Sequence, residues 1–205
     1  MSSSLPVEIL PLTADRFADL AALFEQGGDP RWCWCSSFRL RGQDFTKANP
    51  ASNRRLLRTA VREQPNAPGL VAYEDGVAVG WVSLGPREDF ERLAHSRVLR
   101  PIDETPVWSI VCFVVGRKSR KRGIAGALLD AAIAYARDHG ASTLEAYPTE
   151  VPEGGRIPSA NAYTGTLGMY ERAGFKVVER RQANPTTAVR PIVRLALPGR
   201  KTGRR

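Results

Sequence analysis

The sequence has little of what disulfide-stabilised, metal-binding or membrane-spanning proteins require. Its 205 residues include 3 cysteines and 2 histidines. Cys33 and Cys35 are too close together for an easy mutual bridge, and no second cysteine or histidine pair has a zinc-like spacing. We therefore expect neither a disulfide framework nor a metal site. The absence of a long apolar run and of a signal-peptide pattern predicts a cytoplasmic protein without a membrane partner.

The net charge of +9 does not predict a nucleic-acid-binding protein. Four of the basic residues lie in the segment 199–205, which has no apolar anchor and is expected to be a disordered tail. Five more lie together at 117–122, and no basic stripe is interleaved with aromatic residues. The remaining residues, 1–198, have the length and composition of a single globular domain.

The hydrophobic pattern alternates between strands and helices along the chain. Asp75-Gly76 separates two β-rich runs and predicts a hairpin, whereas the segment 29–49 has no clean period. Thr13 and Ser52 are plausible N-caps of the first two helices. The expected strands are 7–10, 70–73, 77–84, 107–115, 143–147, one from Phe175 and 191–197, and the expected helices are 17–24, one from Ser52 to before Pro65, 127–136 and one around Tyr170.

The run from Arg120 to Gly126, Arg-Lys-Arg-Gly-Ile-Ala-Gly, has the features of an anion site. It follows a β-rich run and opens into an amphipathic helix, whose first N–H groups and dipole favour a negative charge. Gly123 and Gly126 allow a phosphate close to the backbone. Neither the Walker A pattern nor the dinucleotide fingerprint is present. The fitting pattern is Arg/Gln-x-x-Gly-x-Gly/Ala, at Arg120, Gly123 and Ala125, although an ordinary basic strand-to-helix connection would have similar residues.

A second motif follows about 50 residues later, at Met169-Tyr-Glu-Arg-Ala-Gly-Phe175. Gly174 suits the position after a helix that needs a positive φ. Together the two motifs resemble the signatures of the GNAT superfamily of acyl-CoA-dependent N-acetyltransferases. The resemblance implies an α/β (α+β) fold, with a mixed, mostly antiparallel sheet, helices on both faces and a splayed strand pair that admits CoA.

The resemblance also assigns residues to acetyl-CoA, the expected cosubstrate. The backbone of the strand before the loop would pair with the pantetheine amides, as an added strand would. The Tyr170 hydroxyl would protonate the leaving thiolate, although a tyrosine at a helix end is also an ordinary core residue. The residues implied for CoA are Phe113, Val114, Val115, Arg120, Lys121, Arg122, Gly123, Ile124, Ala125 and Gly126.

The acceptor side is less defined by the sequence. Glu145 is a candidate general base, with a solvated or salt-bridged strand residue as the alternative, and the Val115 N–H is a candidate oxyanion donor. Cys112 lacks a basic partner nearby in sequence, which favours direct attack over a covalent intermediate. An apolar or aromatic wall would bind the acceptor, or would instead seal a helix onto the sheet; its residues are Trp32, Cys33, Trp34, Cys35 and Phe38.

Two classes of function remain open at this point. The first is an N-acetyltransferase acting on a primary amine of a small molecule or a protein. The second is a CoA-binding regulatory or interaction module without turnover. A homodimer is possible for either. The sequence departs from the family pattern at Tyr163, where an Asn is frequent, and Gly165 and Gly168 weaken the helix of the second motif by about 1 kcal/mol each.

Overall fold

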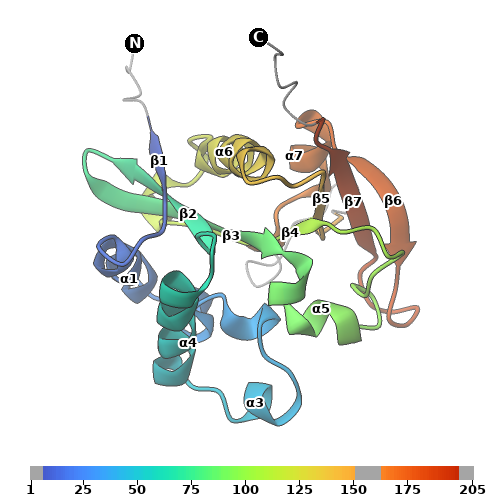
Figure 1. Ribbon diagram of the computed structural model, residues 1–205, viewed down its shortest axis with the longest axis horizontal. Helices are drawn as coiled ribbons and strands as arrows, with labels where there is room; N and C mark the ends of the chain where they lie inside the picture. The colour runs from blue at the N-terminus through green and yellow to red at the C-terminus, as the bar shows by residue number, and fades with distance from the viewer. Residues whose placement is uncertain (1–6, 151–162, 199–205) are drawn as a thin grey trace.

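A seven-stranded mixed sheet forms the centre of the computed structural model, which describes residues 7–150 and 163–198 (Figure 1). The strand order is β1-β2-β3-β4-β5-β7-β6. The strands are β1 (Glu8–Pro11), β2 (Gly69–Glu74), β3 (Val77–Pro86), β4 (Trp108–Val115), β5 (Thr143–Ala146), β6 (Lys176–Arg181) and β7 (Arg190–Ala196). The predicted disordered tail, 199–205, lies outside the described residues.

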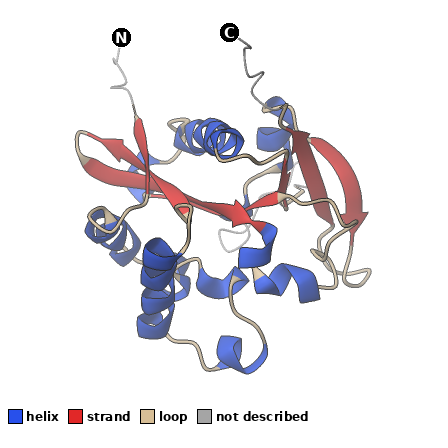
Figure 2. Ribbon diagram, in the orientation of Figure 1, coloured by secondary structure: helices blue, strands red, loops and turns tan. Residues whose placement is uncertain are grey.

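Helices cover both faces of this sheet, as Figure 2 shows. Helices α6 and α7 lie on one face, and α1, α3, α4 and α5 lie on the other. The helices are α1 (Phe17–Glu25), α2 (Asp29–Cys33), α3 (Gly42–Thr46), α4 (Pro50–Glu63), α5 (Glu91–His95), α6 (Ile124–Asp138) and α7 (Leu167–Arg172), with short 3-10 turns η1 (Ser36–Phe38), η2 (Arg87–Asp89) and η3 (Arg117–Ser119). The predicted mixed fold is thereby confirmed.

The two central strands, β4 and β5, diverge at the carboxyl end of β5. β4 and β5 are the parallel pair of the sheet, and they pair only from Trp108 with Leu144 to Ile110 with Ala146. Beyond Ile110, β4 continues to Val115 and stays paired with β3 on its other side. The edge of β4 that faces β5 is therefore free of any described strand from that point onward. This is the predicted splayed pair.

Two buried apolar clusters hold the helices on the sheet. One packs α1 and the segment that follows it against β2, β3 and β4, with Phe24 and Trp81 among its fully buried members. The other packs α6 and α7 on the opposite face. The buried side chains of α6 recur at helical spacing, which explains why that helix was predictable; they are Ile124, Leu128, Leu129, Ala132 and Ala136.

The structure confirms the predicted hairpin turn and corrects two predicted N-caps. Asp75 and Gly76 both have positive φ, 50° and 74°, so the predicted hairpin turn is confirmed. The N-cap of α4 is Asn49 instead of Ser52, and Ser52 completes a capping box with it. Thr13 does not cap α1 either, since its hydroxyl accepts a hydrogen bond from the Arg16 side chain, 2.9 Å away.

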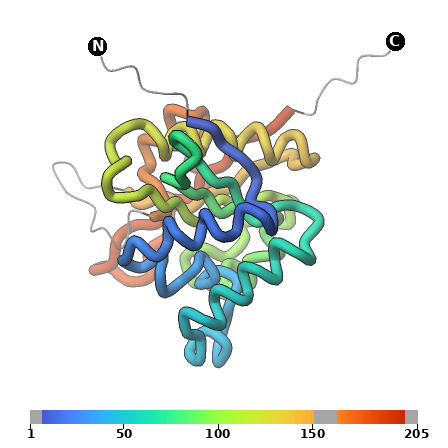
Figure 3. The backbone as a smooth tube through the Cα atoms, turned by 90° about the vertical axis from the view of Figure 1, so that its left-hand side faces the viewer, coloured from blue at the N-terminus to red at the C-terminus, as the bar shows by residue number. Residues whose placement is uncertain are grey.

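The aperiodic segment 29–49 folds into short turns of helix instead of a long element. Trp34 and Cys35 both adopt left-handed backbone conformations, with φ of 46° and 49°, and this breaks the chain between α2 and η1. In the view of Figure 3 these turns and α4 gather at one end of the molecule, opposite the two ends of the chain. The segment thereby brings residues near 30 to the free edge of β4, where the candidate site lies.

Candidate active site

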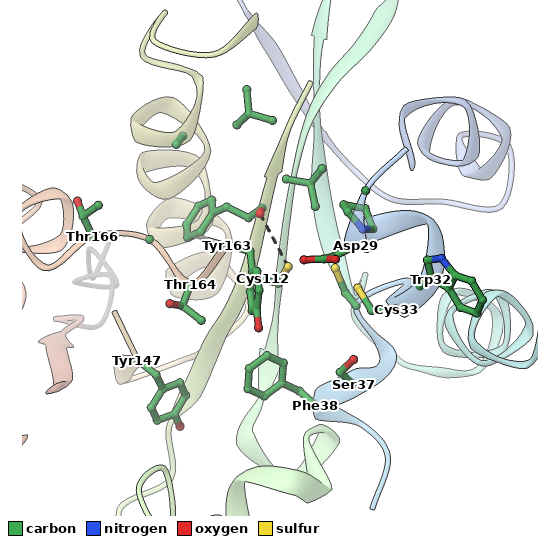
Figure 4. A pocket seen from close by; sticks show the side chains of 18 of the residues that line it. Asp29, Trp32, Cys33, Ser37, Phe38, Cys112, Tyr147, Tyr163, Thr164 and Thr166 are labelled. Atoms are coloured by element: carbon green, nitrogen blue, oxygen red, sulfur yellow. Dashed lines mark hydrogen bonds between the residues drawn. The ribbon is translucent and has the colours of Figure 1, made fainter. Parts of the chain in front are cut away.

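A cavity of about 950 Å³ lies beside the free edge of β4. One wall is formed by β4, another by α2 and η1, and a third by residues 163–166 (Figure 4). The cavity extends from the start of the glycine-bearing loop, at Gly116 and Arg117, to aromatic residues of η1 and α3, Phe38 and Phe45. It therefore connects the predicted cofactor loop with the predicted acceptor region.

The backbone of β4 presents to this cavity an edge that no described strand covers. Phe113, Val114 and Val115 all line it, as predicted. The Gly116 N–H donates to the Val79 carbonyl on β3 at 2.9 Å. Because backbone groups alternate between the two edges of a strand, those of Phe113 and Val115 face the free edge. Such an edge is a template for an extended ligand that carries amide groups.

The loop after β4 ends in an uncapped helix start, as an anion site requires. Gly123 is the N-cap of α6, with φ of 82° and no side-chain cap. A Cβ at Gly123 or Gly126 would have nothing within 4 Å, so this surface is open. Of the predicted loop residues, Arg120 and Ala125 line the cavity, and the Arg120 Nε donates to the Val115 carbonyl oxygen at 3.3 Å.

The other predicted loop residues lie away from the cavity lining. Arg122 forms an ion pair with Glu74, 2.9 Å apart. The side chain of Ile124, the first residue of α6, is buried. Lys121 adopts a positive φ of 62°. For Ile124, Gly123 and Gly126 the backbone N–H groups remain the candidate contacts, because their side chains are buried or absent.

Tyr170 lies one layer behind the cavity wall. Its side chain is fully buried, and its hydroxyl donates to the Thr164 carbonyl oxygen at 3.2 Å. Burial, and to a lesser degree the nearby Cys112, raises the pKa of this phenol well above its ordinary value. Gly165 separates the ring from the cavity, since a Cβ there would lie 2.9 Å from Tyr170 Cε2. The ring also contacts Phe113 edge-on, at 6.4 Å between centroids.

Glu145 lies outside the cavity lining, in a buried polar network, and this geometry does not support its predicted role as a base. Its carboxylate accepts hydrogen bonds from the Tyr147 hydroxyl and the Arg194 Nε, each at 2.7 Å. Arg87 lies 3.9 Å from the same carboxylate. Both oxygens are thus occupied, as in the salt-bridged alternative. The network reaches the cavity only through Tyr147, which lines it.

The structure places the aromatic residues of the predicted wall in two environments. Trp32 and Phe38 line the cavity, with Trp32 64% exposed at its rim. Trp34 does not line it, and the prediction for this residue is wrong. Its ring is buried against α1, stacked on Phe17 at 6.1 Å and edge-on to Phe24 at 5.3 Å. The left-handed turn at Trp34 directs this ring into the core, where it packs α1 onto the sheet, as in the alternative interpretation.

Several residues of the cavity were missed from the sequence. Cys112 lines it opposite Cys33 in Figure 4, whereas Cys33 and Cys35, which also line it, belong to the predicted wall. Asp29 and Tyr163 also face its interior, and Arg190 lines it from the start of β7. One signal could have identified Asp29: Gly27-Gly28 followed by Asp29-Pro30 marks a sharp turn into a helix. The others are brought together by tertiary structure alone.

The chain belongs to the GNAT family of acetyltransferases. The model of the "Acetyltransferase (GNAT) family" matches residues 34–175, more than half of the sequence. The protein is therefore an acyltransferase by family, one that transfers an acetyl group to an acceptor. No curated protein sequence matches the chain.

Solved structures share this fold at low sequence identity. A Corynebacterium glutamicum protein titled "histone acetyltransferase HPA2 and related acetyltransferase" is 19% identical, with a TM-score of 0.56 over 93% of this chain and 96% of that one. The polyamine N-acetyltransferase of Drosophila melanogaster, which forms N-acetylagmatine, is 13% identical, with a TM-score of 0.58 over 94% and 100%. A chain of the NatC complex, bound to a Gag peptide and CoA, is 14% identical, with a TM-score of 0.54 over 94% and 99%.

Two further properties concern the described ranges, 7–150 and 163–198. No helix in them is long and apolar enough to span a membrane. Within the same ranges, no group of three or more histidine, cysteine or acidic side chains is arranged to hold a metal ion.

Proposed function

We propose that this protein transfers an acetyl group from acetyl-CoA to a primary amine by direct attack. The observation that carries the proposal is the free edge of β4, which opens into a cavity of about 950 Å³ and leads to the uncapped start of α6. The helix start and the strand edge suit two different parts of acetyl-CoA. The open surface at Gly123 and Gly126 suits a pyrophosphate, and the strand edge suits the amides of a pantetheine arm.

In this proposal the pantetheine arm follows the free edge of β4, and the thioester lies on that edge within reach of the Val115 N–H. An uncharged amine attacks the thioester carbon, the C–N bond forms and the C–S bond breaks. Negative charge develops on the carbonyl oxygen, and the Val115 N–H faces the free edge and is available as its donor. The Val115 carbonyl is already occupied by Arg120, which also fixes the backbone at this point.

The departing thiolate takes a proton from Tyr170 in this proposal. Support comes from the position of the ring against Phe113, on the strand segment that holds the arm. Its raised pKa keeps the phenol protonated and therefore able to donate throughout the neutral range. To reach the sulfur, the hydroxyl exchanges its bond to the Thr164 carbonyl oxygen for one to the thiolate. Gly165 provides no side chain that would block this path.

The test compares two phenols of the same region, Tyr170→Phe and Tyr163→Phe. Tyr163 lines the cavity directly and is the matched control. With an amine panel and a free-thiol assay, Tyr170→Phe is expected to lower kcat about 100-fold or more, while acetyl-CoA affinity measured by calorimetry stays unchanged. A large loss of kcat in Tyr163→Phe alone would move the donor role to Tyr163. Binding of acetyl-CoA without turnover on any amine would favour the CoA-binding module instead.

A further inference from the structure

The charges inside the cavity are unequally distributed. Among the described residues that line it, Asp29 is the one acid, and four are arginines: Arg92, Arg117, Arg120 and Arg190. Arg117 and Arg120 belong to the loop at the cofactor end. Arg190 lies beyond the carboxyl end of β5, because β7 runs antiparallel to β5 and pairs Val193 with Ala146. The acceptor region therefore has one negative group, Asp29, and two positive groups, of which Arg92 stacks on the Phe45 ring and Arg190 does not.

Asp29 is directed into the cavity by the turn that precedes it. Gly27 and Gly28 have φ of 107° and 80°, conformations that a residue with a Cβ rarely adopts. They reverse the chain at the end of α1, so that α2 begins at Asp29 beside β4. In Figure 4 the Asp29 carboxylate points into the cavity, toward Cys112 and Tyr163. It forms no ion pair with any residue in the described part of the chain.

Arg190 is a half-buried cation on the other side of the same space. Its Nη1 donates to the Thr149 Oγ1 at 3.0 Å, and this bond fixes the guanidinium at the cavity wall. No carboxylate of the described residues lies within ion-pair distance of it. A guanidinium has five N–H donors in a planar fork that matches a carboxylate. A partly desolvated cation that has no counterion among the described residues is stabilised when a ligand supplies one.

Tyr163 shows that the two charges act on the same part of the cavity. Partial burial is the main cause that raises the pKa of its phenol, followed by Cys112. Arg190 acts in the opposite direction and lowers this pKa, whereas Asp29 raises it further. The phenol therefore lies within the electrostatic reach of both groups. A ligand beside Tyr163 would share a cavity lining with a carboxylate, Asp29, and a guanidinium, Arg190.

We propose that the acceptor is an amino acid, whose ammonium group binds Asp29 and whose carboxylate binds Arg190. This inference rests on the acetyl-transfer function proposed above. Asp29 takes one proton from the ammonium, which frees the lone pair for attack on the thioester. After the C–N bond forms and the C–S bond breaks, the nitrogen loses its second proton and the thiolate gains one. The products are an N-acetyl amino acid, CoA as a thiol and one proton released to solvent.

The experiment uses two matched sets of acceptors in one competition. The protein is incubated with acetyl-CoA and an equimolar pool of the proteinogenic L-amino acids and the amines formed by their decarboxylation, and acetylated products are measured by mass spectrometry. Each pair differs only in the carboxylate. We expect the acetylated products to come from the amino acids. Acetylation of the decarboxylated amines alone, or of no member of either set although acetyl-CoA binds, would overturn the proposal.

Three variants separate the roles of the charges. Arg190→Gln is expected to lower kcat/KM for the amino acid about tenfold or more, and to leave the decarboxylated partner unchanged. Asp29→Asn is expected to lower kcat/KM at least tenfold for both. Arg58→Gln, a control at an arginine that stacks on Phe17 away from the cavity lining, is expected to behave as wild type. Equal losses in Arg190→Gln on both members of a pair would also contradict the assignment. Failure of the wild type to bind acetyl-CoA would instead defeat the acetyl-transfer proposal itself.

Discussion

A negative charge at Gly126 tests the anion site without disturbing the fold. Gly126 is the third residue of α6, and a Cβ there would have nothing within 4 Å. Gly126→Asp therefore meets no steric barrier. An acidic residue in the first turn of a helix gains about 0.3–1 kcal/mol from the dipole, and replacing glycine in a helix adds a few tenths more. We expect the free energy of unfolding to rise by about 0.5–1 kcal/mol.

The same charge acts against a pyrophosphate at this helix start. Two unit charges 4 Å apart repel by about 1 kcal/mol in bulk water and about 4 kcal/mol near a protein surface, which corresponds to a loss of affinity between roughly 5-fold and 1000-fold. The assay is calorimetric titration with acetyl-CoA, alongside urea unfolding. Gly126→Asn, equal in size and neutral, is the control. The reasoning is refuted if the aspartate variant binds like wild type, or if the asparagine variant loses as much affinity.

Three further predictions concern stability. Trp34→Ala should lower the free energy of unfolding by about 3–5 kcal/mol because that ring is buried, whereas Trp32→Ala should change it by less than about 0.5 kcal/mol; urea unfolding compares the two. Gly165→Ala places a Cβ at φ +78°, only 2.7 Å from a side-chain carbon, and should cost about 1–3 kcal/mol, seen as a lower Tm. The hydrogen bonds from Arg194 lower the pKa of Asp103 below its ordinary value of 3.8, so their contribution is present above that pH and is lost as pH falls through the folded-state pKa. Acid unfolding of Asp103→Asn should accordingly begin from a lower stability and fall less steeply with pH than wild type.

The main elements of the fold were predictable because their signals are local. The Asp75-Gly76 turn, the glycine that precedes α6 and the apolar stripe of that helix each act within a few residues. The short helices α2, α3 and α5 were not predictable in the same way. Each spans five residues, too few for a hydrophobic period to repeat.

The sequence predicted the parts of the site that a motif and the strand backbone define. It was less able to predict side-chain positions that depend on tertiary contacts. Phe113 and Val115 follow from the order of strand and loop, since their backbone faces the free edge, and Val114 lies between them with its backbone toward β3. The positions of Trp34 and Glu145 could not be predicted, because a left-handed turn directs the Trp34 ring into the core and the half-buried Arg194 binds the Glu145 carboxylate.

Amide hydrogen exchange with and without CoA tests the central claim most directly. The account predicts that CoA slows the exchange of the Phe113 and Val115 amides on the free edge, and of the amides at the start of α6, from Ile124 to Gly126. The Val114 amide faces β3 and should be protected in both states, as an internal control. Protection of the edge and helix amides by CoA would establish the site. Unchanged exchange at both places, with CoA bound elsewhere or not at all, would contradict it.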